Sequence, residues 1–253
     1  MRQSLLPALL EVAQYNRARQ NKHLAFYETG RVFLGQGSDQ LPQEAERFAI
    51  LVSGIETPAS WYQKETVYDF FSLKGMVEGY FEALRLGRRV QYLATDRMKV
   101  MHPGRTAEVY LDDDYVGFLG QLHPQVAADY DLDRATYFAE LDLEVILAAD
   151  RPELLQQPIA KFPSSTRDLA LLVQEDQPHA DLVHLIQSQG GPYLVSVDLF
   201  DQYAGDNIED GKQSLAYHLV FQDPERTLTD DEIDQAMSQI QSALETVAGL
   251  EIR

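Results

Sequence analysis

A proline-rich segment near residue 155 constrains this chain most, because it divides the chain into two parts that must fold separately. Arg151–Pro163 holds three prolines and two consecutive glutamines, a composition typical of a linker and poorly suited to a helix interior or a central strand. We therefore predict one domain over residues 1–150, a linker over 151–160 and a second domain over 161–253.

The first part predicts an α+β domain with a mostly antiparallel sheet, because short β-favouring runs alternate with helical patterns. Ser4 is expected to cap the first helix. Helices are predicted over 5–20, Phe70–Leu86 and Pro124–Tyr130. Strands are predicted over Leu24–Phe33, Phe48–Ile55, Val90–Ala94, Ala107–Leu111, Val116–Leu122 and Tyr137–Leu143.

The second part has the element order β-α-β-β-α-β, which predicts a ferredoxin-like domain. Thr229 and Glu232 form a capping box at the start of the last helix. The predicted strands are Asp168–Gln174, Tyr193–Tyr203, Lys212–Gln222 and Leu250–Arg253, and the predicted helices are His179–Gln189 and Thr229–Leu250.

Several chemistries are excluded by composition and spacing. The chain has no cysteine, which removes disulfides, thiolate zinc sites, iron–sulfur clusters and cysteine nucleophiles. Its six histidines lack metal-ligating spacing, and no G-x-S-x-G, Walker-type or G-x-G-x-x-G motif occurs. The longest apolar run, Leu169–Val173, is far too short to span a bilayer, and no signal peptide is visible. We expect a cytoplasmic protein without a catalytic residue, a metal site or a membrane partner.

Two segments of the first part have competing interpretations. Asp112–Asp114 is either a cation ligand or a solvated turn, and the turn is favoured. His102–Arg105 is expected to be a turn in which Gly104 takes a positive φ. Arg105 then either binds an anion or pairs locally, and local pairing is favoured.

The strand that ends at Tyr203 carries the strongest binding pattern. Asp201 and Tyr203 are two residues apart, so they point to the same face. A tyrosine can stack on an unpaired base while a carboxylate accepts hydrogen bonds from its edge, and Ser214 on the next strand could add a hydroxyl. The alternative, favoured on these residues alone, is that Tyr203 only covers the sheet edge.

Nine motifs in order give the chain a resemblance to the C-terminal part of the β subunit of bacterial phenylalanyl-tRNA synthetases. They are MRQSLLPALLEVAQYN, FYETGRVF, DFFSLKG, HPGRTAEVY, GFLGQLHP, FPSSTRDLAL, LFDQYAG, GKQSLAYHL and ERTLTDDEI. The resemblance implies a non-catalytic class II synthetase-like domain followed by a ferredoxin-fold anticodon-binding domain, both belonging to a longer subunit.

The resemblance also implies that this part of the subunit makes no aminoacyl-adenylate. Active class II enzymes place a phosphate-binding arginine after the strand that matches FYETGRVF, but Leu34 follows Phe33 here. GFLGQLHP likewise contains no G-x-G-x-x-R motif. We therefore expect no cofactor in this chain, since ATP and magnesium serve the complete enzyme. The implied partners are the catalytic α subunit and a second β subunit in an α2β2 tetramer.

By the same resemblance, Tyr203 would stack on the first anticodon base of tRNA-Phe and Asp201 would read its edge. Ser214 and Ala216 would line the same patch. DNA is not an implied partner. The loop DNIEDGKQS departs from the expected short hydrophobic or proline-containing loop and brings in Asp206, Glu209 and Asp210.

Charge limits how such a domain could bind RNA. The chain carries a net charge of −19, of which −12 falls on the residues from Lys161 onward. We therefore expect a small contact with an unpaired base and a shallow salt dependence, because few phosphates would be neutralised. One alternative is an amino-acid-sensing regulatory module, since the ferredoxin-like fold also hosts small ligands. A hydrolase built on Asp and Glu clusters is the other, but no acid pair has an evident partner.

Overall fold

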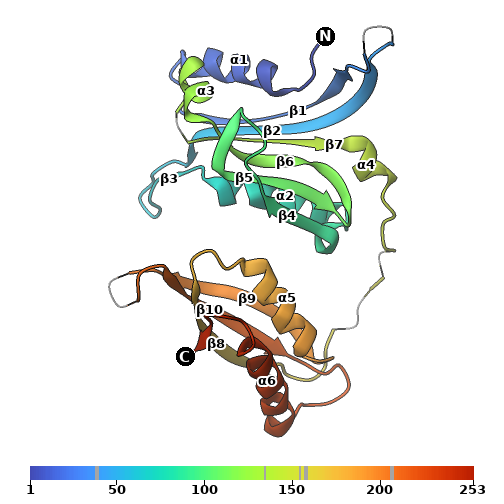
Figure 1. The fold of residues 1–253 in the computed structure, drawn as a ribbon, viewed down its shortest axis with the longest axis vertical. Coiled ribbons are helices and arrows are strands. Elements are labelled where there is room, and N and C mark those ends of the chain that lie inside the picture. The colour runs from blue at the N-terminus through green and yellow to red at the C-terminus, as the bar shows by residue number, and fades with distance from the viewer. Residues whose placement is uncertain (38–39, 134, 154, 157–158, 206–207) are drawn as a thin grey trace. The chain divides into compact units, whose positions relative to one another are not determined.

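A computed structural model describes residues 1–37, 40–133, 135–153, 155–156, 159–205 and 208–253. Contacts between Cα atoms group the chain into two compact units, Met1–Leu154 and Leu155–Arg253, called unit 1 and unit 2 below (Figure 1). Pro158, one of the three linker prolines, lies outside the described residues.

Unit 1 contains one seven-stranded antiparallel sheet, so the predicted α+β class with a mostly antiparallel sheet is confirmed. Six strands follow the order β1-β2-β7-β6-β5-β4, and β3 pairs with β2. The strands are β1 His23–Leu34, β2 Gln43–Thr57, β3 Thr66–Val67, β4 Val90–Ala94, β5 Met101–Leu111, β6 Asp114–Leu122 and β7 Thr136–Asp142. The helices are α1 Leu6–Arg17, α2 Phe70–Ala83, η1 Gly87–Arg89, α3 Pro124–Asp129 and α4 Leu143–Ala148.

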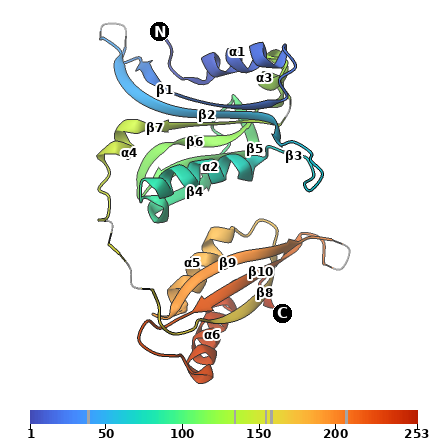
Figure 2. The same ribbon diagram turned by 180° about the vertical axis from the view of Figure 1, so that it is seen from behind.

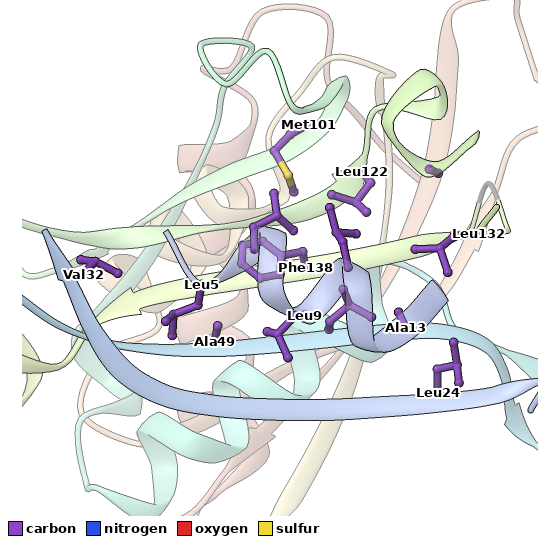
Figure 3. Packing of buried hydrophobic residues seen from close by; sticks show 14 of the residues in the cluster. Leu5, Leu9, Ala13, Leu24, Val32, Ala49, Met101, Leu122, Leu132 and Phe138 are labelled. Carbon is purple, nitrogen blue, oxygen red and sulfur yellow. The ribbon is translucent and has the colours of Figure 1, made fainter. Parts of the chain in front are cut away.

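Helix α1 packs on one face of this sheet. Its residues Leu9 and Ala13 join Phe138 of β7 in a cluster that excludes water (Figure 3). The helix start is held by Glu140, a buried carboxylate that accepts hydrogen bonds from Leu5 N at 2.7 Å and from Ser4 Oγ at 2.8 Å. Leu5 rather than Ser4 occupies the N-cap position. Ser4 Oγ instead accepts a hydrogen bond from Leu6 N at 3.1 Å. Because the same hydroxyl donates to Glu140, it links the first turn of the helix to this carboxylate.

Helices α2 and α4 cover the opposite face. Leu73, Val77 and Phe81 of α2 and Ile146 of α4 are buried in a second cluster with the middle strands. A capping box between Asp69 and Ser72 starts α2, while its last turn closes at Ala83, earlier than predicted. The helix α4 that follows β7 was not predicted, because its six residues are too few for a periodic pattern.

The His102–Arg105 turn is a wrong prediction. These residues lie inside β5, where the pairing with β6 shifts between Met101 and Thr106. The shift accommodates the extra residues without a reversal, and Gly104 does not take a positive φ. Asp112–Asp114 does form the predicted turn, with Asp112 at φ 54° and its carboxylate paired with Arg89.

Unit 2 has the predicted ferredoxin-like arrangement, a four-stranded antiparallel sheet in the order β11-β8-β10-β9 with two helices on one face (Figure 2). Buried residues of α5 and α6 pack on alternate residues of the strands. The strands are β8 Ser165–Gln174, β9 Leu194–Tyr203, β10 Lys212–Phe221 and β11 Glu251–Ile252, and the helices are α5 His179–Gln189 and α6 Asp230–Leu244.

Helix α6 ends six residues earlier than predicted. From Thr246 the amides bond three residues back, as Val247 N does to Leu244 O at 2.9 Å, and Gly249 turns the chain with φ 78°. Tightened i→i+3 bonds are a common way for an α-helix to end. The turn frees the chain to enter β11.

The capping box at Thr229 and Glu232 is confirmed. It also makes the stability of unit 2 sensitive to acid, through the carboxylate of Glu232. Arg226 donates two hydrogen bonds to Glu232, at 2.6 and 2.7 Å, and Thr229 N donates a third at 3.0 Å. These donors lower the pKa of Glu232 from 4.5 to about 2. A lowered folded-state pKa stabilises the fold above the unfolded value, and that contribution is lost as the pH falls through the folded value.

We therefore expect the melting temperature of unit 2 to fall between about pH 4.5 and pH 2, with a smaller fall in Glu232→Gln. Glutamine keeps the capping geometry but cannot lose a charge. Thermal unfolding of dilute protein, followed by circular dichroism at several pH values, measures both. Parallel curves for the two proteins would contradict the role of this carboxylate.

Candidate nucleic-acid interface

The register of β9 and β10 brings the four predicted site residues together. Tyr203 lies directly opposite Ser214, and Asp201 lies opposite Ala216. The residues of β10 that alternate with these two, Leu215 and Tyr217, are buried under the helices. Because side chains alternate along a strand, the four site residues occupy the face of the sheet that α5 and α6 leave open (Figure 2).

Tyr203 presents its ring at the end of this face. The residue is 45% exposed, which leaves ring surface available for stacking. Gly205 lies against the ring: a Cβ added there would stand 2.6 Å from Tyr203 Oη. Any larger residue at 205 would therefore displace the tyrosine ring.

Two further residues of the open face were missed, Phe200 and His218. Simple alternation would place Phe200 on the buried face, since it lies one residue from Asp201. The β9–β10 register shifts there: Leu199 pairs with Tyr217 and Asp201 with Ala216, which leaves Phe200 as a bulge residue. Phe200 is 58% exposed and lies edge-on to the His218 ring, with 6.3 Å between centroids. A bulge has no reliable signal in a single sequence.

The open face is acidic. Asp168 and Asp198 lie opposite His218 on either side, and His218 Nδ1 is 2.6 Å from Asp168 Oδ1. With Asp201, three carboxylates share this face. These carboxylates would repel the phosphates of an RNA backbone on this face. The edge of an unpaired base, in contrast, carries N–H groups that can donate hydrogen bonds to carboxylates.

Most basic residues of unit 2 are already paired. Lys212 contacts Glu209 at 3.0 Å and Glu251 at 2.9 Å, and the hydrogen bonds to these carboxylates raise the pKa of Lys212. Arg167 and Arg226 pair with acids of α6. Few cations therefore remain to grip an RNA backbone.

The acidic loop between β9 and β10 is partly accounted for by these pairs. Glu209 is the partner of Lys212, so its charge is locally balanced. Asp210 is exposed, and Asp206 lies outside the described residues.

In unit 1, the two segments compared with synthetase motifs hold no arginine at the expected places. Leu34, at the place of the phosphate-binding arginine, packs against the α1 cluster. GFLGQLHP forms most of β6 and its exit to α3, and it contains no arginine. No three His, Asp or Glu among the described residues gather as a metal site, and none of the described helices is long and apolar enough to cross a membrane.

Two family models match the two units. The model of the phenylalanyl tRNA synthetase beta chain CLM domain matches residues 1–143, and that of the ferredoxin-fold anticodon binding domain matches 160–253. This pair of domains defines a polypeptide of the aminoacyl-tRNA synthetase class. Since the first model covers more than half of the chain, the chain belongs to the phenylalanyl-tRNA synthetase β-chain family.

Known proteins agree with the family assignment. The chain is 44% identical over its whole length to the phenylalanine–tRNA ligase beta subunit of Lactiplantibacillus plantarum and 42% identical to that of Geobacillus kaustophilus. It spans 31% of the length of each. Among solved structures, a pyrrolysyl-tRNA synthetase from Desulfitobacterium hafniense superposes with a TM-score of 0.43 at 17% identity, covering 58% of this chain and 48% of that one.

Proposed function

We propose that this chain acts within a phenylalanine–tRNA ligase, where unit 2 binds the anticodon of tRNA-Phe. Unit 1 serves as a non-catalytic scaffold that docks the catalytic α subunit. The observation that supports the RNA role is the β9–β10 register, which brings an exposed tyrosine, an acid and a hydroxyl together at one end of the open face. A second β subunit completes the tetramer in the cytoplasm, and ATP and magnesium are used by the assembled enzyme.

The patch suits one unpaired base better than a helix. Tyr203 offers a face for stacking. Asp201, two residues away on the same strand, accepts hydrogen bonds from N–H groups on the edge of the stacked base. Ser214 adds a hydroxyl directly opposite Tyr203. Because neighbouring carboxylates repel phosphates, affinity has to come from the base and from contacts elsewhere in the complete enzyme.

Binding by the chain alone is expected to be weak and to depend only shallowly on salt. Neutralising one or two phosphates gives a slope of about −1 in a plot of log K against log salt. Titration of an anticodon stem-loop at several salt concentrations measures the slope. Tight binding of arbitrary duplex RNA, or a slope near −5, would contradict the proposed surface. Heat released by free phenylalanine instead of the stem-loop would favour the regulatory alternative.

The segments of unit 1 that match the synthetase motifs lack the charges that adenylation requires. Stabilising a phosphoryl displacement takes preorganised positive groups around the α-phosphate, and neither Leu34 nor GFLGQLHP supplies one. The test is phenylalanine-dependent ATP–pyrophosphate exchange. We expect no exchange with this chain alone and normal exchange with the α subunit in its complete complex. Exchange by the isolated chain would refute the scaffold role.

Gly205 gives a test of ring placement. In Gly205→Ala the new methyl group cannot coexist with the present position of Tyr203 Oη, so we expect the ring to move and stem-loop affinity to fall several-fold. Gly211→Ala is unsuitable as a control because its φ is 82°. Gly75→Ala in α2 is the matched control, since nothing lies within 4 Å of its added Cβ. Equal affinities for the two variants would remove the argument for Gly205.

A further inference from the structure

A pocket of about 450 Å³ lies in unit 1, where the first turns of α2 meet β4 and β5. It is remote in sequence from the proposed RNA patch and uses the His102–Arg105 segment that the proposed function leaves unexplained. Phe70, Phe71 and Tyr92 supply aromatic walls, while Lys74 and Arg105 supply positive charge. Figure 1 shows α2 beside β4 and β5.

The two cations differ in how they are held. Arg105 is exposed, and its Nη1 donates to Gln121 Oε1 at 2.9 Å, which fixes the guanidinium while its planar fork has further donors. Lys74 Nζ stands 4.6 Å from the centre of the Tyr92 ring and pairs with Glu78 one turn along α2. Because Glu78 balances the charge of Lys74, the positive charge bordering this pocket comes mainly from Arg105, and Lys74 can contribute when a ligand anion competes with Glu78.

The aromatic walls differ in exposure: Phe71 is exposed, whereas Phe70 and Tyr92 are half-buried. Phe71 is 72% exposed and meets Phe70 edge-to-face at 5.6 Å. Tyr92 Oη is buried and has no hydrogen-bond partner among the described residues, and burial raises the pKa of this tyrosine. The hydroxyl therefore stays a neutral donor. An apolar pocket with a few convergent polar groups is the ordinary form of a small-molecule site.

We propose that this pocket binds a small aromatic anion. The ligand's ring lies against Phe71, and its carboxylate or phosphate pairs with Arg105 and Lys74. A guanidinium binds a carboxylate and a phosphate equally well in geometry. The experiment below therefore distinguishes a carboxylate ligand from a phosphate ligand. The bulged course of β5 is what carries Arg105 to the pocket, since the register shift falls between Met101 and Thr106.

Calorimetric titration of the 253-residue chain tests the proposal with three probes: AMP, 3-phenylpropionate and inorganic phosphate. We expect saturable one-to-one binding of at least one aromatic probe, with inorganic phosphate about tenfold weaker or absent because it lacks the ring. Preference for AMP identifies a phosphate ligand, and preference for 3-phenylpropionate identifies a carboxylate. Failure of both aromatic probes at millimolar concentration, or equal binding of inorganic phosphate, overturns the proposal.

Variants assign the binding to this pocket. Arg105→Gln and Lys74→Met should each weaken it by about tenfold, since each removes a charge-assisted contact, and methionine keeps an aliphatic stem over Tyr92. Phe71→Ala should weaken it similarly. Glu78→Gln should strengthen it, because the competing partner of Lys74 is removed. Arg19→Gln, which removes an exposed cation in the turn after α1, is the matched control and should change nothing.

The test of this pocket can be distinguished from the test of the proposed RNA patch. Tyr203→Ala should bind the aromatic probe as the parent chain does, because Tyr203 belongs to unit 2. Circular dichroism melting curves confirm that each variant is folded. Loss of probe binding in Arg19→Gln or in Tyr203→Ala would show that the site lies elsewhere and would refute the assignment.

Discussion

Replacing Tyr203 by alanine in the complete ligase should raise the KM for tRNA-Phe about tenfold or more, with kcat little changed. Stacking of a base on an aromatic side chain contributes about 1–3 kcal/mol, and each 1.4 kcal/mol corresponds to a factor of about ten. Tyr203 is 45% exposed on the open face of unit 2, so its removal deletes a contact surface without opening the core.

Two controls isolate the ring. Tyr203→Phe keeps the stacking surface and should leave KM near the parental value. An anticodon stem-loop that lacks its first anticodon base should bind the parent chain and Tyr203→Ala equally weakly. In both complexes the base that would stack on residue 203 is absent. An unchanged KM in Tyr203→Ala would reject the stacking role.

Replacing Phe138 by alanine should destabilise unit 1 by about 3–5 kcal/mol, the usual cost of truncating a buried phenylalanine. Phe138 is fully buried between α1 and the sheet, in contact with the cluster drawn in Figure 3. The loss should loosen α1 in particular, because Phe138 belongs to the cluster on which the buried face of this helix packs. Urea unfolding followed by limited proteolysis of each unit measures the effect.

Phe221→Ala is the reciprocal variant, since Phe221 is equally buried in the core of unit 2. Each substitution should shift the transition of its own unit and leave the other near its parental midpoint. If the proposed roles are correct, Phe138→Ala should also impair co-purification with the α subunit, and Phe221→Ala should impair stem-loop binding. A common shift of both units would show that they unfold together.

Elements that bury a face could be predicted from periodicity. β4, α5 and β10 appear where the pattern places them, because their apolar residues recur at the spacing of the element. The four residues of the RNA patch also come together, since two-residue spacing and a hairpin register fix which side chains share a face. Their assignment to an RNA base came from the family resemblance and remains a prediction.

The features that sequence patterns missed depend on partners distant in the chain. Glu140 lies 136 residues from Ser4, so no local pattern could show that a carboxylate starts α1. The bulge at Phe200 and the register shift before Thr106 are properties of strand pairs. Helix α6 stops at Leu244 although Val247 continues its apolar spacing, because the chain must turn there to reach β11.

The bulge in β9 separates a strand that builds the core from a strand end that faces solvent. Before it, Val197 and Leu199 lie opposite Leu219 and Tyr217; after it, Asp201 and Tyr203 face outward beside Ala216 and Ser214. Deleting Phe200 would therefore leave both pairings intact, whereas inserting one residue after it would turn the acid and the ring toward the helices. The end of the strand can vary in sequence while the core stays fixed, provided that no single residue is inserted after the bulge.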